Sequence, residues 1–115
     1  RKLITEQPAL VAGFLRASNR ALKETLANPT AAIAAIKQRE PILDEPVEVE
    51  RWRLTAQYVA APDVAAHGLG DVRKALLEEQ ITQVAQVFGL QNRPAADSVF
   101  ERSLLPTVAE RAHKA

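Results

Sequence analysis

The histidines are the first residues to test for chemistry, and the chain has only two of them. His67 precedes the short run Gly68-Leu69-Gly70, and His113 lies near the end of the chain. A protein metal site needs three or four converging ligands, and no His-x-x-x-His spacing occurs in the sequence. Cysteine is absent, which excludes a thiolate ligand and a thiol nucleophile within this chain. We therefore predict no metal site, no catalytic residue and no cofactor.

Two further catalytic patterns are not supported by the spacing of the residues. Gly68 and Gly70 lack the third glycine and the preceding strand of a phosphate-binding loop. A Ser-His-Asp triad can be assembled on paper from Ser18, His67 and Asp71, but nothing in their spacing supports it. His67 remains the one candidate for ligand contact, because loops carry function more often than helices do. The alternative is a surface or structural histidine.

An acidic group of three glutamates has two interpretations. Glu45, Glu48 and Glu50 follow Asp44 at the expected start of a helix. They resemble a cation site in composition, but carboxylates are also favoured at a helix N-terminus by the helix dipole. The second interpretation is preferred.

A basic row also has two interpretations. Arg16, Arg20 and Lys23 recur at spacings of four and three residues and therefore share one helix face. They could contact a phosphate or a partner, but such a row is more often a solvated face. Trp52, the only tryptophan, falls on an apolar stripe, which favours core packing over stacking on a ligand.

Composition indicates packed helices. Of the 115 residues, 47% are hydrophobic and 21 are alanine, whereas only 4 are glycine and 4% are aromatic. This balance favours helices over a β-sandwich or barrel. Fifteen basic against 14 acidic residues exclude a strong electrostatic attraction to nucleic acid or an anionic membrane. The longest largely apolar run, residues 9–15, is too short to span a bilayer.

The periodicity and the proline and asparagine breaks predict a mainly α chain of about five helices, with at most the end of a strand at residues 2–5. We expect a loop at residues 63–70 and a polar tail at residues 107–115 that is frayed from residue 110 onward. The expected helices cover residues 8–27, 30–38, 45–61, 72–88 and 97–105. Asn28 and Asp44 are the expected N-caps of the second and third helices, Asp71 is the expected cap of the fourth, and Gly89 is expected to end the fourth. Seven side chains are expected to be mostly buried, either against one another or against a part of the protein outside this chain, namely Phe14, Leu22, Ile33, Trp52, Leu77, Ile81 and Phe88.

Five segments carry a resemblance to a known family. They are residues 6–17 (Glu-Gln-Pro-Ala-Leu-Val-Ala-Gly-Phe-Leu-Arg-Ala), 26–29 (Leu-Ala-Asn-Pro), 66–70 (Ala-His-Gly-Leu-Gly), 89–90 (Gly-Leu) and 99–106 (Val-Phe through Leu-Leu-Pro). In this order and spacing the chain resembles the C-terminal portion of the NMT1/THI5-like substrate-binding proteins. These proteins serve ABC importers for sulfonates, nitrate and thiamine pyrimidine precursors.

The resemblance implies a parent protein with the two-lobed, type II periplasmic-binding-protein α/β fold. Residues 1–106 would then be the C-terminal helical part of one lobe, followed by the polar tail at 107–115. The implied partners are a small-molecule ligand and the membrane subunits of an ABC importer, with neither nucleic acid nor direct membrane insertion. The implied location is periplasmic or extracytoplasmic. Because the chain begins at Arg1 and contains no methionine, we expect a piece of a longer polypeptide, with most ligand-binding residues upstream.

Two alternatives stay open at this stage. One is a relative of the pyrimidine synthase in the same superfamily, which would need a reactive histidine and a cysteine-rich segment; no cysteine is present here. The other is an independent helical interaction domain. A largely exposed apolar helix face would favour a part of a larger lobe, whereas a closed polar surface would favour the independent domain.

Overall fold

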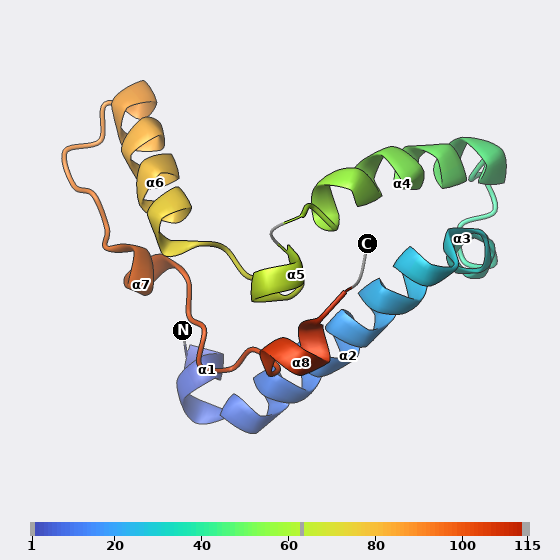
Figure 1. Ribbon diagram of the computed structural model, residues 1–115, viewed down its shortest axis with the longest axis horizontal. Helices are drawn as coiled ribbons and strands as arrows, with labels where there is room; N and C mark the ends of the chain where they lie inside the picture. Colours follow the sequence, from blue (N-terminus) through green and yellow to red (C-terminus); the bar gives the residue numbers. More distant parts are fainter. Residues whose placement is uncertain (1, 63, 114–115) are drawn as a thin grey trace.

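The computed structural model describes residues 2–62 and 64–113, so Arg1, Asp63 of the expected loop and residues 114–115 of the expected tail lie outside the described residues. Over the described ranges the chain is helical and contains no strand. The prediction of a mainly α chain is therefore confirmed. The helices are α1 Lys2–Glu6, α2 Pro8–Ala27, α3 Pro29–Lys37, α4 Glu45–Val59, α5 Val64–His67, α6 Lys74–Phe88, α7 Ala96–Val99 and α8 Val108–Arg111 (Figure 1).

The predicted helix caps at Asn28 and Asp44 are confirmed. The Asn28 side chain accepts a hydrogen bond from the backbone N–H of Ala31 at 3.0 Å and so begins α3. The Asp44 carboxylate accepts one from the N–H of Val47 at 3.2 Å and begins α4. Each side chain satisfies one of the N-terminal donors that have no partner within the helix. Gly89 ends α6 with a φ of 63°, a left-handed conformation that glycine adopts readily.

We expect Asn28→Ala to lower the free energy of unfolding by about 1 kcal/mol, the usual effect of losing an N-cap. The change removes the acceptor for the N–H of Ala31 and leaves the backbone intact. Asn92→Ala, at an exposed position outside the helices, is the matched control and should change stability little. Urea unfolding of both variants checks this prediction, and equal stabilities would contradict it.

The strand end that the prediction allowed at residues 2–5 does not form, because these residues belong to the helix α1. A strand needs a neighbour to satisfy its backbone groups, and the described residues contain no strand to pair with it. A helical turn satisfies those groups locally: the N–H of Gln7 donates to the carbonyl of Leu3 at 2.9 Å. Lys2 and Glu6 add an exposed ion pair one helical turn apart, at 3.9 Å.

The start of α6 also differs from the prediction. The helix begins at Lys74, with Arg73 rather than Asp71 at the cap position and no side-chain cap. Asp71 does not cap the helix because its carboxylate accepts a hydrogen bond from Arg102 and pairs with Arg111. A long-range ion pair has thus replaced the local cap that the sequence pattern indicated.

Three shorter segments were predicted incorrectly. The expected loop at 63–70 contains the helix α5, whose end is closed by a 2.7 Å hydrogen bond from the N–H of Gly68 to the carbonyl of Val64. The expected helix at 97–105 is reduced to α7, because Phe100 is extended and the chain beyond it turns toward residues 71–72. The first two residues of the segment expected to be frayed, Glu110 and Arg111, instead belong to α8, which Thr107 and Glu110 cap reciprocally.

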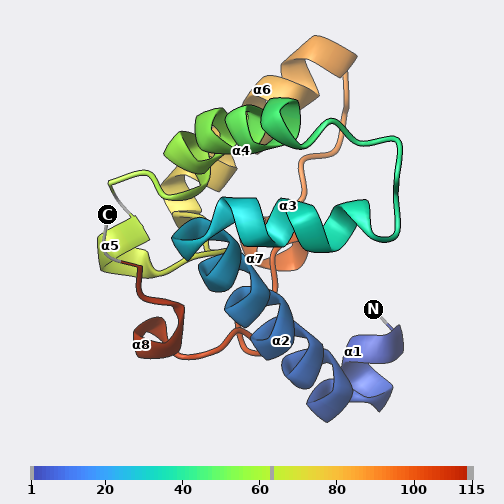
Figure 2. The same cartoon turned by 90° about the vertical axis from the view of Figure 1, so that its right-hand side faces the viewer.

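The helices do not close into one bundle. Figure 2 shows α3 crossing the end of α2, with α4 running alongside α3, whereas Figure 1 shows α4 and α6 standing apart on either side of α5. The buried apolar residues of the described chain are correspondingly few, namely Ile33, Leu69, Ala85 and Ala96.

The predicted core is confirmed only in part. Ile33 is buried, and four of the expected residues are half-buried, namely Leu22, Trp52, Leu77 and Ile81. Phe14 and Phe88 are 70% and 73% exposed, so they are not buried within the described chain, and their burial against a part of the protein outside it stays a prediction. Periodicity identified the apolar face of each helix correctly, but no described helix covers these two positions. The indole N–H of Trp52 is buried and finds no acceptor among the described residues.

Candidate functional site

The turn that follows His67 is held tightly to the C-terminal segment. Gly68 and Gly70 have φ values of 78° and 76°, and between them Leu69 is completely buried. The N–H of Leu69 donates to the carbonyl of Arg111 at 2.9 Å. The backbone at Gly68 approaches Arg111 so closely that a Cβ atom there would lie 2.8 Å from the Arg111 Cβ. Only glycine meets both the conformational and the steric requirement.

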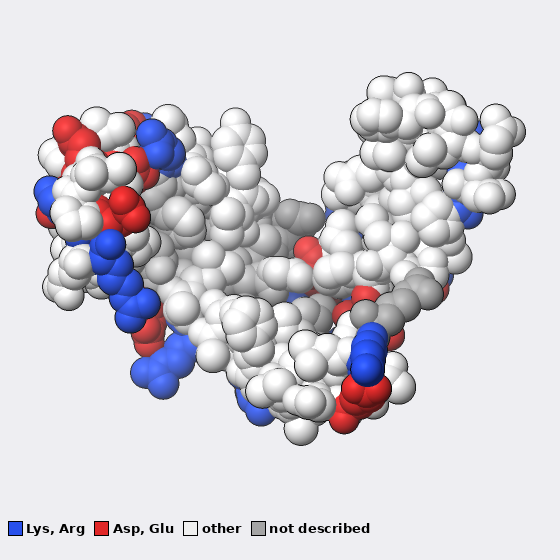
Figure 3. Space-filling model, turned by 180° about the vertical axis from the view of Figure 1, so that it is seen from behind, with Lys and Arg blue, Asp and Glu red and all other residues white. Residues whose placement is uncertain are grey.

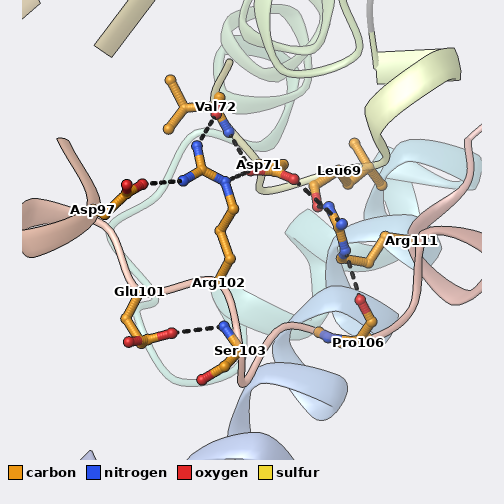
Figure 4. Close-up of polar contacts among 9 residues, drawn as sticks. All are labelled: Leu69, Asp71, Val72, Asp97, Glu101, Arg102, Ser103, Pro106 and Arg111. Carbon is orange, nitrogen blue, oxygen red and sulfur yellow. Dashed lines mark hydrogen bonds and ion pairs between the residues drawn. The ribbon is translucent and has the colours of Figure 1, made fainter. Parts of the chain in front are cut away.

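Arg111 is the central side chain of this junction and is only 4% exposed (Figure 4). Its Nε donates to the carbonyl of Pro106 at 2.8 Å, and its Nη1 donates to the carbonyl of Leu69 at 3.0 Å. Its Nη2 lies 3.5 Å from Oδ2 of Asp71. The guanidinium therefore joins the C-terminal segment 106–111 to residues 69–71, which are 40 and 42 positions away at Asp71 and Leu69, and its charge has a carboxylate partner.

Arg102 approaches the same carboxylate from another direction. Its Nε donates to Oδ1 of Asp71 at 3.2 Å, and its Nη2 donates to the carbonyl of Val72. A second carboxylate, Asp97, lies 3.7 Å from its Nη1. The guanidinium carbon also lies 5.0 Å from the centre of the Phe100 ring, within the range of a cation–π contact.

Asp71, Arg102 and Arg111 together form what we call the arginine–aspartate cluster. Its guanidinium groups donate to backbone carbonyls and to Asp71, which leaves no group poised to act as a base or nucleophile. The proposed use of Asp71 in a Ser-His-Asp triad has no support here, because its two oxygens face arginines. The cluster is a structural junction between residues 68–72 and the segment from Asp97 to Arg111.

His67 lies at the end of α5, on a hollow of about 290 Å³ between α4, α5 and the start of α6. The side chain is exposed. Tyr58 and Arg73 also line this hollow and can donate hydrogen bonds, and the remaining wall is largely apolar, including Val59, Val64 and Leu76. The polar side chains on this hollow are therefore an imidazole, a phenol, the guanidinium of Arg73 and the carboxylate of Asp71.

The acidic group on α4 does not form a cation site. Its three carboxylates each pair with a basic side chain: Glu45 with Lys37 at 3.3 Å, Glu48 with Arg51 at 2.7 Å and Glu50 with Arg53 at 2.7 Å. The hydrogen bond from Arg53 is the main reason that the pKa of Glu50 lies below its ordinary value. Among the described residues no group of histidine, aspartate or glutamate side chains is arranged to hold a metal ion.

The basic row on α2 faces α8. Arg16 and Arg20 are exposed, as expected for a solvated face, whereas Lys23 is half-buried and donates to the carbonyl of Glu110 at 3.0 Å. The row lines a hollow of about 520 Å³ beside α8.

Sequence reasoning missed Arg102 and Arg111. A local signal for the second was present, because Thr107-Val108-Ala109-Glu110 is a capping-box pattern that predicts a helix start. In the structure Oγ1 of Thr107 accepts from the N–H of Glu110 at 3.2 Å, and Oε2 of Glu110 accepts from the N–H of Thr107 at 2.8 Å. No comparable local pattern marks Arg102, whose hydrogen-bond partners are 31 and 30 residues away.

Comparisons with known protein families, curated proteins and solved structures find no significant match to this chain. The family resemblance therefore stays a prediction. None of the helices in residues 2–62 and 64–113 has the length and apolar character needed to cross a membrane.

Proposed function

We propose that the chain is the C-terminal helical part of one lobe of a solute-binding protein that delivers a small molecule to an ABC importer. The ligand class would be a sulfonate, nitrate, a thiamine-pyrimidine precursor or a similar compound. The protein would act by binding rather than catalysis, in a periplasmic or extracytoplasmic location. The proposal rests on the order of the five sequence segments and on the way this chain leaves its apolar surface open.

The open apolar surface is the observation that carries the proposal. Large apolar side chains are exposed on each of the long helices, including Phe14 on α2, Ile36 on α3, Leu54 on α4 and Val87 on α6. Figure 3 shows a hollow between two arms whose facing walls are largely uncharged, with some charged atoms on its floor and most of the others along the outer edge of one arm and the lower edge of the molecule. Helices of α/β proteins bury one face against a sheet. A helical layer with an uncovered apolar face suits that architecture.

A panel of solutes tests the proposal on the native protein that carries this chain. We expect one of methanesulfonate, nitrate or an aminopyrimidine to raise the melting temperature in a saturable manner, because a ligand that binds only the folded state stabilises it. Chloride at matched ionic strength is the control. Absence of a saturable shift with every member of the panel would contradict the proposal.

His67→Ala should leave the affinity for that solute within a factor of about ten, equivalent to about 1.4 kcal/mol. His67 is exposed at the end of α5, and the proposal places most ligand-binding residues outside this chain. Calorimetric titration of the variant, with folding checked by circular dichroism, measures the effect. A larger loss in a folded variant would place the solute in the hollow beside His67.

The two alternatives predict different outcomes. A pyrimidine synthase that consumes its own histidine would change mass during turnover, which intact mass spectrometry would detect. An independent interaction domain would unfold cooperatively when residues 1–115 are produced alone. The exposed apolar faces of α2 and α6 favour the lobe over the independent domain, because monomeric domains rarely expose large contiguous apolar surface.

A further inference from the structure

The hollow between α2 and α8 combines three cationic side chains on one helix face. Arg16, Arg20 and Lys23 line it together with the amide of Asn19, and α8 closes the opposite side with Glu110. Its volume of about 520 Å³ lies within the range of small-molecule sites. It shares no lining residue with the hollow beside His67.

The charges in this hollow do not cancel. Its two carboxylates already have partners: Glu24 pairs with Nε of Arg20 at 2.8 Å, and Glu110 accepts hydrogen bonds from Thr107. Within the described residues, Arg16 forms neither an ion pair nor a hydrogen bond. Lys23 uses one of its donors on a neutral carbonyl. The hydrogen bonds from Thr107 lower the pKa of the Glu110 carboxyl, and the attraction of Arg16 through space lowers it further, but the three cations still outnumber the two carboxylates by one charge.

The two walls are held in place by contacts within the chain. Arg16, Asn19 and Lys23 project from α2, which is 20 residues long. The opposite wall is held by the capping box of α8 and by the buried guanidinium of Arg111, which donates to the carbonyl of Pro106. Donors that are positioned before a ligand arrives lose less entropy on binding.

We propose that this hollow binds a small soluble molecule through an oxyanion, such as a phosphate or sulfonate group. Arg16 presents a planar guanidinium whose paired N–H groups match two oxygens of such a group. The amide of Asn19 and the remaining ammonium protons of Lys23 supply further donors from the same helix face. This proposal does not rest on the proposed function, because it is argued from the lining of this hollow alone.

Calorimetric titration of the native protein with inorganic phosphate and with phenyl phosphate tests the site, using chloride at matched ionic strength as the reference. We expect saturable binding with a Kd of about 1 mM or tighter. Arg16→Gln should weaken it at least about tenfold, because it removes the unpaired charge. Asn19→Asp, which is nearly isosteric, should weaken it similarly by placing a carboxylate against the anion.

Arg39→Gln is the matched control, since Arg39 is exposed in the turn after α3 and lies outside this hollow. The Kd of Arg39→Gln for each probe should lie within about twofold of the value for the unmodified protein, as expected for a distant surface substitution. Circular dichroism confirms that all three variants are folded. Two results would overturn the proposal: no saturable binding of either probe, or unchanged affinity in a folded Arg16→Gln or Asn19→Asp variant.

Discussion

Arg111→Met should lower the free energy of unfolding by about 2–4 kcal/mol, the largest effect expected for any side chain outside the apolar core. Methionine fills much of the volume but donates no hydrogen bonds. The carbonyls of Leu69 and Pro106, both on buried residues, would lose their guanidinium donors. Burying a polar group without a partner is costly, and this variant would leave two such groups.

Urea unfolding of the native protein measures the global effect, and amide hydrogen exchange locates it. Exchange should accelerate at Leu69, whose N–H is bonded to the carbonyl of Arg111, and through α8. Arg39→Met is the control for loss of an exposed arginine and should change stability by less than about 0.5 kcal/mol. If Arg111→Met changed the free energy of unfolding no more than this control does, the guanidinium would not hold the two segments together.

Gly68→Ala should destabilise the same junction by about 2–4 kcal/mol, through two effects that add at one position. The φ of 78° is unfavourable for a residue with a side chain. The new Cβ would also lie 2.8 Å from the Cβ of Arg111 and 3.1 Å from its Nη1. The nearest of these atoms belongs to a buried residue and cannot move away without disturbing the turn.

Gly70→Ala separates the two effects, because Gly70 has nearly the same φ, 76°, but no atom within 4 Å of an added Cβ. Gly70→Ala should lower the free energy of unfolding only through the unfavourable backbone conformation, by about 1–2 kcal/mol. The difference between the two variants in urea unfolding therefore reports the close approach of Gly68 to Arg111. If both variants lowered the free energy of unfolding equally, the close approach of the new Cβ to Arg111 would not destabilise the protein measurably.

The junction and the hollow beside α8 are coupled through the same helix. Arg111 anchors α8 from its buried side, while Glu110 contacts Lys23 on the side that faces α2. Loss of the Arg111 anchor should therefore also weaken oxyanion binding, whereas Arg16→Gln should weaken binding and leave stability nearly unchanged. This asymmetry distinguishes a residue that positions the wall from one that contacts the ligand.

Local sequence signals predicted the long helices because each signal depends on neighbours within one or two turns. Pro8, Asn28, Asp44 and Gly89 act through backbone groups that are at most five residues away, and the structure places all of them as expected. The composition, rich in alanine and poor in glycine, indicated the helical class for the same reason.

The tertiary structure decided what these signals could not, namely which charges meet and which apolar faces are covered. Asp71 resembles a helix cap in sequence, but two arginines from 31 and 40 residues away engage its carboxylate. Phe14 and Phe88 lie in helical register, yet burial requires a second surface, and none of the described helices supplies it. Long-range ion pairs and burial depend on the three-dimensional approach of distant segments, which spacing along the chain does not encode.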